Sequence, residues 1–129
     1  LADQVEGAVT LDYSAIPDPL RQFLTYESKW VEDSFYYQNT PVVCPAIVDD
    51  ETRVRILDTA MRAYRALSLR DYGRVDMRYR DGVAYVLEVN ENPNLAADAG
   101  FYRGANRLGY TYTRMIEHIL QIALRPTLQ

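Results

Sequence analysis

The chain carries Gly73-Arg74-Val75-Asp76 and, after a short turn, Glu88-Val89-Asn90-Glu91-Asn92-Pro93. These two stretches predict neighbouring strands that place one arginine, two carboxylates and an amide near one another. Carboxylate and amide oxygens beside a fixed cation suit Mg²⁺ and phosphate better than other ligand classes. The pattern therefore predicts half of an ATP-binding site.

A hairpin turn between the two strands is predicted at Asp81-Gly82, and two registers satisfy it. A two-residue loop would set Val75 opposite Glu88, which mixes polar and apolar residues on both faces. A three-residue loop, Arg80-Asp81-Gly82 with its glycine in the left-handed conformation, sets Arg74 opposite Glu88 instead. Because a one-residue slip moves every side chain to the other face, we expect the three-residue loop.

This register predicts one polar and one apolar face. The polar face collects Arg74, Asp76, Glu88 and Asn90, and Asp76 lies opposite Val86. The apolar face collects Val75, Met77, Tyr79, Val83, Tyr85, Leu87 and Val89. A solvated hairpin with a cross-strand salt bridge, contributing well under ~1 kcal/mol, is the competing interpretation. The run of amides from residue 90 to residue 94 favours a ligand loop, because amides continue a strand poorly.

The composition indicates a single globular domain spanning residues 1–129. A net charge of −4 argues against a nucleic-acid partner. The only cysteine, Cys44, excludes an intrachain disulfide and a cysteine metal site, which fits a reducing, cytoplasmic setting. No apolar stretch approaches the ~20 residues of a membrane span, and no signal peptide is visible. The chain begins at Leu1 rather than at a methionine, from which we expect a processed or excised piece of a longer protein.

Two main helices and an antiparallel sheet are predicted, which defines an α+β class. The clearer helix spans about Asp50–Leu67, with acids in its first turn and apolar residues at helical spacing. The second spans about Thr111–Leu124 and contains His118, which we interpret as a helix residue rather than a catalytic group. Short strands are predicted at 8–11 and 22–25, and loops at 26–44 and 95–110.

Five stretches occur in an order that carries a family resemblance: Thr25-Tyr26-Glu27-Ser28-Lys29-Trp30, Cys44-Pro45-Ala46, the helix at Asp50–Leu67, Gly73-Arg74-Val75-Asp76 and Leu87-Glu88-Val89-Asn90. Together they resemble the C-terminal half of an ATP-grasp domain. The resemblance is closest to D-alanine–D-alanine ligase and related carboxylate–amine ligases. It covers about Arg21 to Leu124, and the Arg-x-Asp and Glu-x-Asn pair is its most specific part.

The resemblance implies a role for each matching residue. Asp76 matches a position that binds one Mg²⁺, Glu88 a position that bridges two, and Asn90 a position that completes the second. Arg74 matches an arginine that steadies the transferring phosphoryl group. Lys29 matches a lysine that reaches the ATP phosphates from a mobile loop. It is the only lysine of the chain, and a point charge suits phosphate, although an incidental loop lysine is the alternative.

The resemblance also implies a reaction and its cofactors. In this family a carboxylate attacks the γ-phosphate of ATP, and an amine then displaces phosphate from the acyl phosphate. The implied cofactors are ATP and two Mg²⁺ ions, with Mn²⁺ as an alternative, and the implied partners are a small-molecule carboxylate and an amine. Metal and arginine together neutralise the charge that such a transfer develops.

Two departures from the family pattern argue against D-alanine as the substrate. Asn94 stands where these ligases usually carry a glycine, and Ala99 stands where they carry a serine near the acceptor amino acid. Arg103, Asn106 and Arg107 are either ligands for a substrate carboxylate or surface loop residues.

The N-terminal domain of the family, its glycine-rich phosphate loop and its adenine-binding segment have no counterpart in the sequence. We therefore expect the missing N-terminal half as a partner, and no activity from the isolated piece. The alternative is a non-catalytic domain that binds a divalent ion or a nucleotide, or a structural partner of another chain. A missing half would also leave an apolar sheet surface, which would allow a homodimer.

Overall fold

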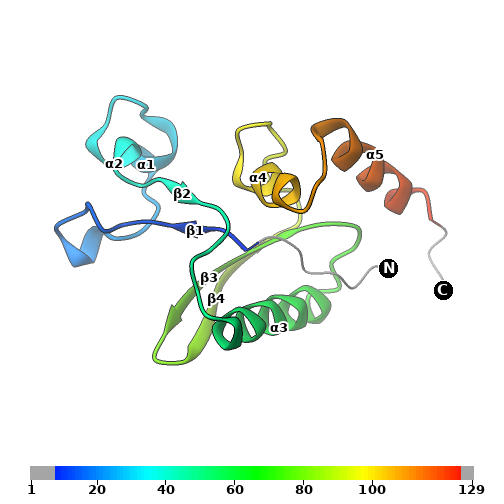
Figure 1. Cartoon of the computed structure of the whole chain (residues 1–129), viewed down its shortest axis with the longest axis horizontal. Coiled ribbons are helices and arrows are strands. Elements are labelled where there is room, and N and C mark those ends of the chain that lie inside the picture. Colours follow the sequence, from blue (N-terminus) through cyan, green and yellow to red (C-terminus); the bar gives the residue numbers. More distant parts are fainter. Residues whose placement is uncertain (1–7, 126–129) are drawn as a thin grey trace. The chain divides into compact units, whose positions relative to one another are not determined.

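The computed structural model describes residues 8–125, which form two compact units (Figure 1). One unit comprises residues 9–47, and the other comprises residue 8 and residues 48–125. The elements follow in the order β1 (Thr10–Leu11), a 3₁₀ turn η1 (Pro19–Arg21), α1 (Tyr26–Trp30), α2 (Phe35–Gln38), β2 (Val42–Val43), α3 (Asp50–Ala66), β3 (Arg74–Arg80), β4 (Val83–Asn90), α4 (Gly100–Arg107) and α5 (Tyr112–Ala123). Helices with antiparallel strands confirm the predicted α+β class. None of the described helices is long and apolar enough to cross a membrane.

The 9–47 unit is built around the short antiparallel pair β1 and β2. Thr10 lies opposite Val43, and just beyond the pair the backbone N–H of Asp12 donates to the carbonyl of Pro41 at 3.0 Å. β1 confirms the strand predicted at 8–11. Ile16 is almost fully buried in this unit and forms part of its small core.

The loop predicted at 26–44 is wrong, because the segment contains the single-turn helices α1 and α2. Each begins at a hydroxyl cap: Thr25 Oγ1 accepts the N–H of Ser28, and Ser34 Oγ accepts the N–H of Tyr37, both at 3.1 Å. The strand predicted at 22–25 is also wrong, since these residues lead from η1 into α1. Helices of four or five residues are too short to show a 3.6-residue periodicity.

Helix α3 matches its predicted span to within one residue. Asp49 caps its N-terminus by accepting the N–H of Thr52 at 2.8 Å, and Leu67 forms its C-cap. This hydrogen bond holds the pKa of the Asp49 carboxyl below its ordinary value.

Strands β3 and β4 form the predicted hairpin, but with a different turn. Arg80 lies opposite Val83, so the loop consists of the two residues Asp81 and Gly82. The expected three-residue loop is therefore wrong. Both loop residues have positive φ, 52° and 78°, which confirms the left-handed conformation predicted for Gly82. Two left-handed residues match the right-handed twist of the flanking strands, which favours this turn.

A β-bulge inside the hairpin returns Glu88 and Asn90 to the face of Arg74 and Asp76, which the two-residue loop alone would not allow. Asp76 lies opposite Glu88 but Met77 lies opposite Val86, so Leu87 is the extra residue. Arg74 accordingly faces Asn90. The predicted pairings of Arg74 with Glu88 and of Asp76 with Val86 are wrong, because they placed the extra residue in the loop instead of the strand.

The two-residue loop places the β4 residues between the turn and the bulge on the faces opposite to those predicted. The face toward α3 carries Val75, Met77, Tyr79, Ala84, Val86 and Val89. Val83 and Tyr85 lie on the polar face, opposite Arg80 and Arg78, and both are exposed. The expectation that these two side chains join the apolar face is therefore wrong.

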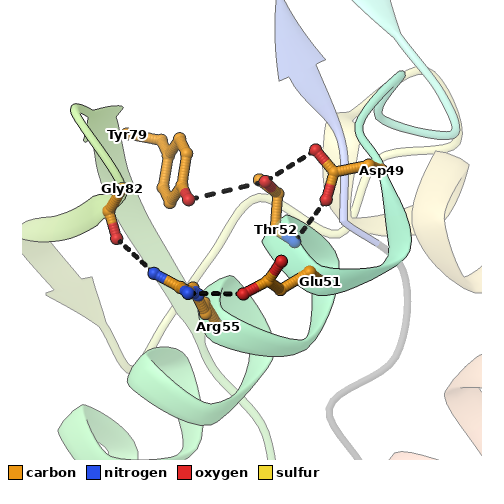
Figure 2. Close-up of polar contacts among 6 residues, drawn as sticks. All are labelled: Asp49, Glu51, Thr52, Arg55, Tyr79 and Gly82. Carbon is orange, nitrogen blue, oxygen red and sulfur yellow. Dashed lines mark hydrogen bonds and ion pairs between the residues drawn. The ribbon is translucent and has the colours of Figure 1, made fainter.

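Polar contacts hold the tip of the hairpin to the first turns of α3 (Figure 2). The Arg55 guanidinium donates to the carbonyl of Gly82 at 3.2 Å and also pairs with Glu51. The hydroxyls of Thr52 and Tyr79 lie 3.4 Å apart. These contacts link residues 27 positions apart and orient the hairpin on the helix.

The loop predicted at 95–110 is also wrong, because α4 lies within it. Gly100 and Gly109 stand at the start of α4 and beyond its end, with Gly109 at φ 90°, so Gly104 is the only glycine in the helix interior. Three glycines lower helix propensity, which concealed this element. Helix α5 confirms the second predicted helix, and the rings of Tyr102 and Tyr112 join α4 to α5 edge to face, with centroids 5.4 Å apart.

Candidate magnesium and phosphate site

Four of the predicted site residues share one face of the β3–β4 hairpin. The register pairs Arg74 with Asn90 and Asp76 with Glu88. Residues two apart on a strand and residues directly opposite on its neighbour point to the same face, with Cβ atoms of opposite residues about 5 Å apart. The prediction that these four residues share one face is therefore confirmed, although the cross-strand pairing from which it was derived is wrong.

Arg74 is bound to Asp76 along the same strand. Its Nε donates to Oδ1 at 2.6 Å and its Nη2 donates to Oδ2 at 2.9 Å, so both carboxylate oxygens are engaged. The two side chains are 36% and 29% exposed, which makes the pair partly shielded from solvent. The hydrogen bond with Asp76 raises the pKa of Arg74, and the charges of Asp76 and Glu88 add to the rise while burial opposes it. This ion pair lies within one strand, unlike the cross-strand salt bridge of the competing interpretation.

The loop after β4 is ordered by its own amide side chains. Asn90 Oδ1 accepts the N–H of Asn92 at 2.8 Å, and Asn94 Oδ1 accepts the N–H of Ala96 at 2.9 Å. Pro93 is buried between these two turns. An amide oxygen has two lone pairs, so Asn90 keeps acceptor capacity for a further ligand.

Gly73 is a site residue to which the sequence reasoning assigned no role. A Cβ at this position would come 2.7 Å from Leu69 Cδ2 and 3.3 Å from the carbonyl oxygen of Asn90. Any side chain at position 73 would therefore require Leu69 to move and the start of β3 to shift away from the end of β4. A glycine immediately before a predicted strand was the available signal.

Lys29 belongs to the other unit of the chain. It lies in α1, one residue before the end of that helix, and is exposed. The mobile loop implied by the family resemblance is thus a short helix here. Its phosphate-binding role stays a prediction.

The oxygen donors of the hairpin fit Mg²⁺. Asp76 and Glu88 supply two carboxylates, and Asn90 supplies an amide oxygen on the same face. Within residues 8–125 no three side chains among His, Cys, Asp and Glu gather into a cage for a metal ion. Mg²⁺ commonly uses one or two carboxylates and completes its octahedron with water and substrate phosphate. The donor set is typical of that kind of site.

The polar residues of α4 form hydrogen bonds within the helix and with the residues that flank it. Asn106 Nδ2 donates to the Tyr102 hydroxyl and to the carbonyl of Tyr110, both at 3.2 Å, and Arg103 Nε donates to the carbonyl of Asp98 at 3.1 Å. Asn106 therefore stabilises the end of α4. A substrate-binding role for Arg103 and Arg107 stays a prediction.

Comparison with known proteins agrees with this fold. The family described as the D-ala D-ala ligase C-terminus matches residues 6–121. An uncharacterized protein of Sinorhizobium fredii is 33% identical over 103 residues, covering 79% of this chain and 30% of that protein. A D-alanine–D-alanine ligase of Actinobacillus succinogenes is 29% identical over 125 residues, covering 96% of this chain and 37% of the ligase.

Solved structures give the same result. The D-alanine–D-alanine ligase of Bacillus anthracis in complex with ATP superposes with a TM-score of 0.65 and 28% identity, covering 72% of this chain and 31% of the ligase. A second structure of the Bacillus anthracis ligase gives a TM-score of 0.63 and 27% identity, covering 67% of this chain and 29% of the ligase.

The fold and the hairpin define the C-terminal half of an ATP-grasp enzyme domain. Within that class, the chain belongs to the D-alanine–D-alanine ligase C-terminal family. It spans about a third of the length of the relatives that it matches.

Proposed function

We propose that the chain is the phosphate- and metal-binding part of an ATP-dependent carboxylate–amine ligase that works through an acyl phosphate. The observation that carries this proposal is the shared face of Arg74, Asp76, Glu88 and Asn90. The match to a ligase solved in complex with ATP supports ATP as the nucleotide. In this proposal the protein works in the cytoplasm, together with the N-terminal half of the ligase.

Each residue of the face has a part in the proposal. Asp76, Glu88 and Asn90 would hold two Mg²⁺ ions. Lys29, which lies outside this face in the 9–47 unit, would bind the ATP phosphates. When bound, Mg²⁺ neutralises phosphate charge and favours the in-line geometry of the transfer. Arg74 has the planar donor fork that matches phosphoryl oxygens, so it steadies the transferring group.

The proposed reaction has two steps. A carboxylate oxygen of the first substrate attacks the γ-phosphorus of ATP, the bond from that phosphorus to the β,γ-bridging oxygen breaks, and ADP leaves. The amine nitrogen of the second substrate then attacks the acyl carbon, loses a proton and expels phosphate. Negative charge develops on the phosphoryl oxygens and later on the acyl oxygen, and donors fixed in a partly shielded site stabilise both. Arg74 is the arginine of this face that lies beside the proposed metal ligands Asp76 and Glu88, so it is the donor proposed for both charges.

The substrates belong to the classes of small carboxylates and amines, and we infer a pair other than two D-alanines. Ala99 is the N-cap of α4 and has no hydroxyl to offer an acceptor amino acid. Asn94 uses its side chain to turn the loop that follows the site. Both positions therefore differ chemically from those of the D-alanine ligases that the chain resembles.

The test is the release of ADP by the full-length protein, measured with a panel of amino acids and hydroxy acids in all pairs. We expect ADP release that depends on one acid and one amine, with the product carrying a new amide bond. Binding of Mg²⁺ or ATP without turnover of any pair would favour the non-catalytic alternative and overturn the ligase proposal.

A further inference from the structure

Arg74 occupies the carboxylate that the proposed function assigns to a metal ion. Its guanidinium donates to both oxygens of Asp76, at 2.6 and 2.9 Å. A fork-to-fork pair of this kind uses the lone pairs that face the arginine, and it is among the strongest hydrogen-bonded pairs in proteins. Any ion that binds Asp76 must therefore share the carboxylate with a guanidinium or displace it.

Sharing is electrostatically unfavourable. Mg²⁺ binds oxygen at about 2.1 Å, so an ion on either oxygen of Asp76 would lie roughly 4 Å from the guanidinium. Two cations at that separation repel strongly where solvent is partly excluded, and the Arg74 and Asp76 side chains are only 36% and 29% exposed.

Glu88 favours a cation at Asp76 in either state. It lies directly opposite Asp76, and like charges opposite each other on a sheet repel. One cation at the pair relieves this repulsion, whether it is the guanidinium or a metal ion.

We propose that Arg74 and a divalent cation exclude one another at Asp76, so that metal binding releases the guanidinium toward the transferring phosphoryl group. The inference rests on the metal role that the proposed function gives to Asp76. Arg74 is then a counter-ion before the metal binds and a phosphoryl ligand afterwards. The site would load its metal first and present its arginine second.

The first experiment measures Mn²⁺ binding to the full-length protein without nucleotide, by electron paramagnetic resonance. Arg74→Ala should bind Mn²⁺ about tenfold more tightly than the wild type, since a charge-assisted competitor has been removed. Arg80→Ala is the matched control for the loss of one positive charge from the same face of β3, and it should change affinity by less than about twofold. Asp76→Asn should weaken binding and abolish the difference between wild type and Arg74→Ala.

The outcomes separate this inference from the proposed function. Equal Mn²⁺ affinities in Arg74→Ala and Arg80→Ala, with weaker binding in Asp76→Asn, would overturn the exclusion and leave the metal role intact. Mn²⁺ affinity that does not respond to Asp76→Asn would overturn the metal role, and the inference with it.

A second measurement needs no substitution and so does not depend on the folding of a variant. The Nε–H signal of Arg74 in an arginine-labelled ¹⁵N–¹H spectrum should move toward the position of solvent-exposed arginines as Mg²⁺ is added. Its midpoint should coincide with that of the backbone amides of Glu88 and Asn90. An unchanged Arg74 signal while those amides titrate would overturn the exclusion.

Discussion

Asp76 lies directly opposite Glu88 in the β3–β4 ladder, and the extra residue Leu87 follows immediately on the side of the turn. Like charges directly opposite each other oppose folding, so this pair contributes nothing favourable to the hairpin by itself. Arg74 offsets the repulsion through its two hydrogen bonds to Asp76. A bulge beside two facing carboxylates is the arrangement expected where a strand aims side chains at a ligand.

Glu88→Gln tests the metal role of the hairpin in the full-length protein. We expect turnover to fall by about a hundredfold or more, because a neutral amide replaces a charged ligand at the transferring phosphate. The free energy of unfolding should change by less than about 0.5 kcal/mol, since Glu88 is exposed. Glu91→Gln, which changes an exposed carboxylate three residues further along, is the control for both measurements. Wild-type turnover in Glu88→Gln would end the metal hypothesis.

Arg74→Lys tests the planar donor fork. An ammonium keeps the charge but cannot reproduce the planar two-donor hold on a phosphoryl group, so kcat/KM for ligation should fall about a hundredfold. Arg80→Lys makes the same change on the same face, where Arg80 pairs with the highly exposed Asp81, and should leave kcat/KM unchanged. Equal activities of the two variants would show that only the charge of Arg74 matters.

The chain of residues 1–129 alone should bind Mg²⁺–ATP weakly and turn over no substrate. It spans about a third of the length of the relatives that it matches, and the family resemblance implies a glycine-rich phosphate loop in the part that it does not cover. Titration calorimetry should give a Kd above about 100 μM, which corresponds to a free energy weaker than about −5.5 kcal/mol. Micromolar affinity, or phosphate release that depends on an added acid, would contradict this expectation.

Gly82→Ala should destabilise the hairpin through its backbone conformation. A Cβ would meet Arg55 Nη1 at 3.5 Å, an ordinary contact, so the φ of 78° is the source of strain. We expect the free energy of unfolding to fall by about 1 kcal/mol in denaturant titrations. Asp81→Asn is the informative partner: it changes the other left-handed residue to one that tolerates this conformation better, and stability should be maintained or rise. A loss of equal size in Asp81→Asn would point to the side chains rather than to φ.

The cap of α3 predicts a pH dependence of stability. The pKa of Asp49 is lowered in the folded chain because its carboxylate accepts the N–H of Thr52, so its ionised form stabilises the fold above the unfolded pKa of about 4. This contribution is lost as the pH falls through the lower, folded value. Asn is an equally good cap that does not titrate. The Tm of the wild type should therefore fall relative to that of Asp49→Asn as the pH is lowered from 6 to about 3. A difference independent of pH would contradict the cap assignment.

Local patterns predicted the elements that depend on neighbouring residues. Acids at the start and apolar residues at helical spacing sufficed for α3, and α5 followed from its own periodicity. Asp81-Gly82 marked the turn, and alternation near the strand ends brought Arg74, Asp76, Glu88 and Asn90 to one face. The short helices α1 and α2 lacked such a pattern, because four or five residues cannot show a helical periodicity, and the hydroxyl caps of Thr25 and Ser34 stabilise them. Helix α4 has no side-chain cap, and its glycines concealed it.

The alternation of the sequence was thus sufficient to bring Arg74, Asp76, Glu88 and Asn90 to one face, whereas their cross-strand pairing, and the positions of Val83 and Tyr85, depend on the folded hairpin. The twist of the strands favours a two-residue turn. With that turn and no bulge, Glu88 would lie on the same face as Ala84 and Val86, which pack against α3. An extra residue at Leu87 satisfies both requirements, and no pattern local to either strand specifies its position.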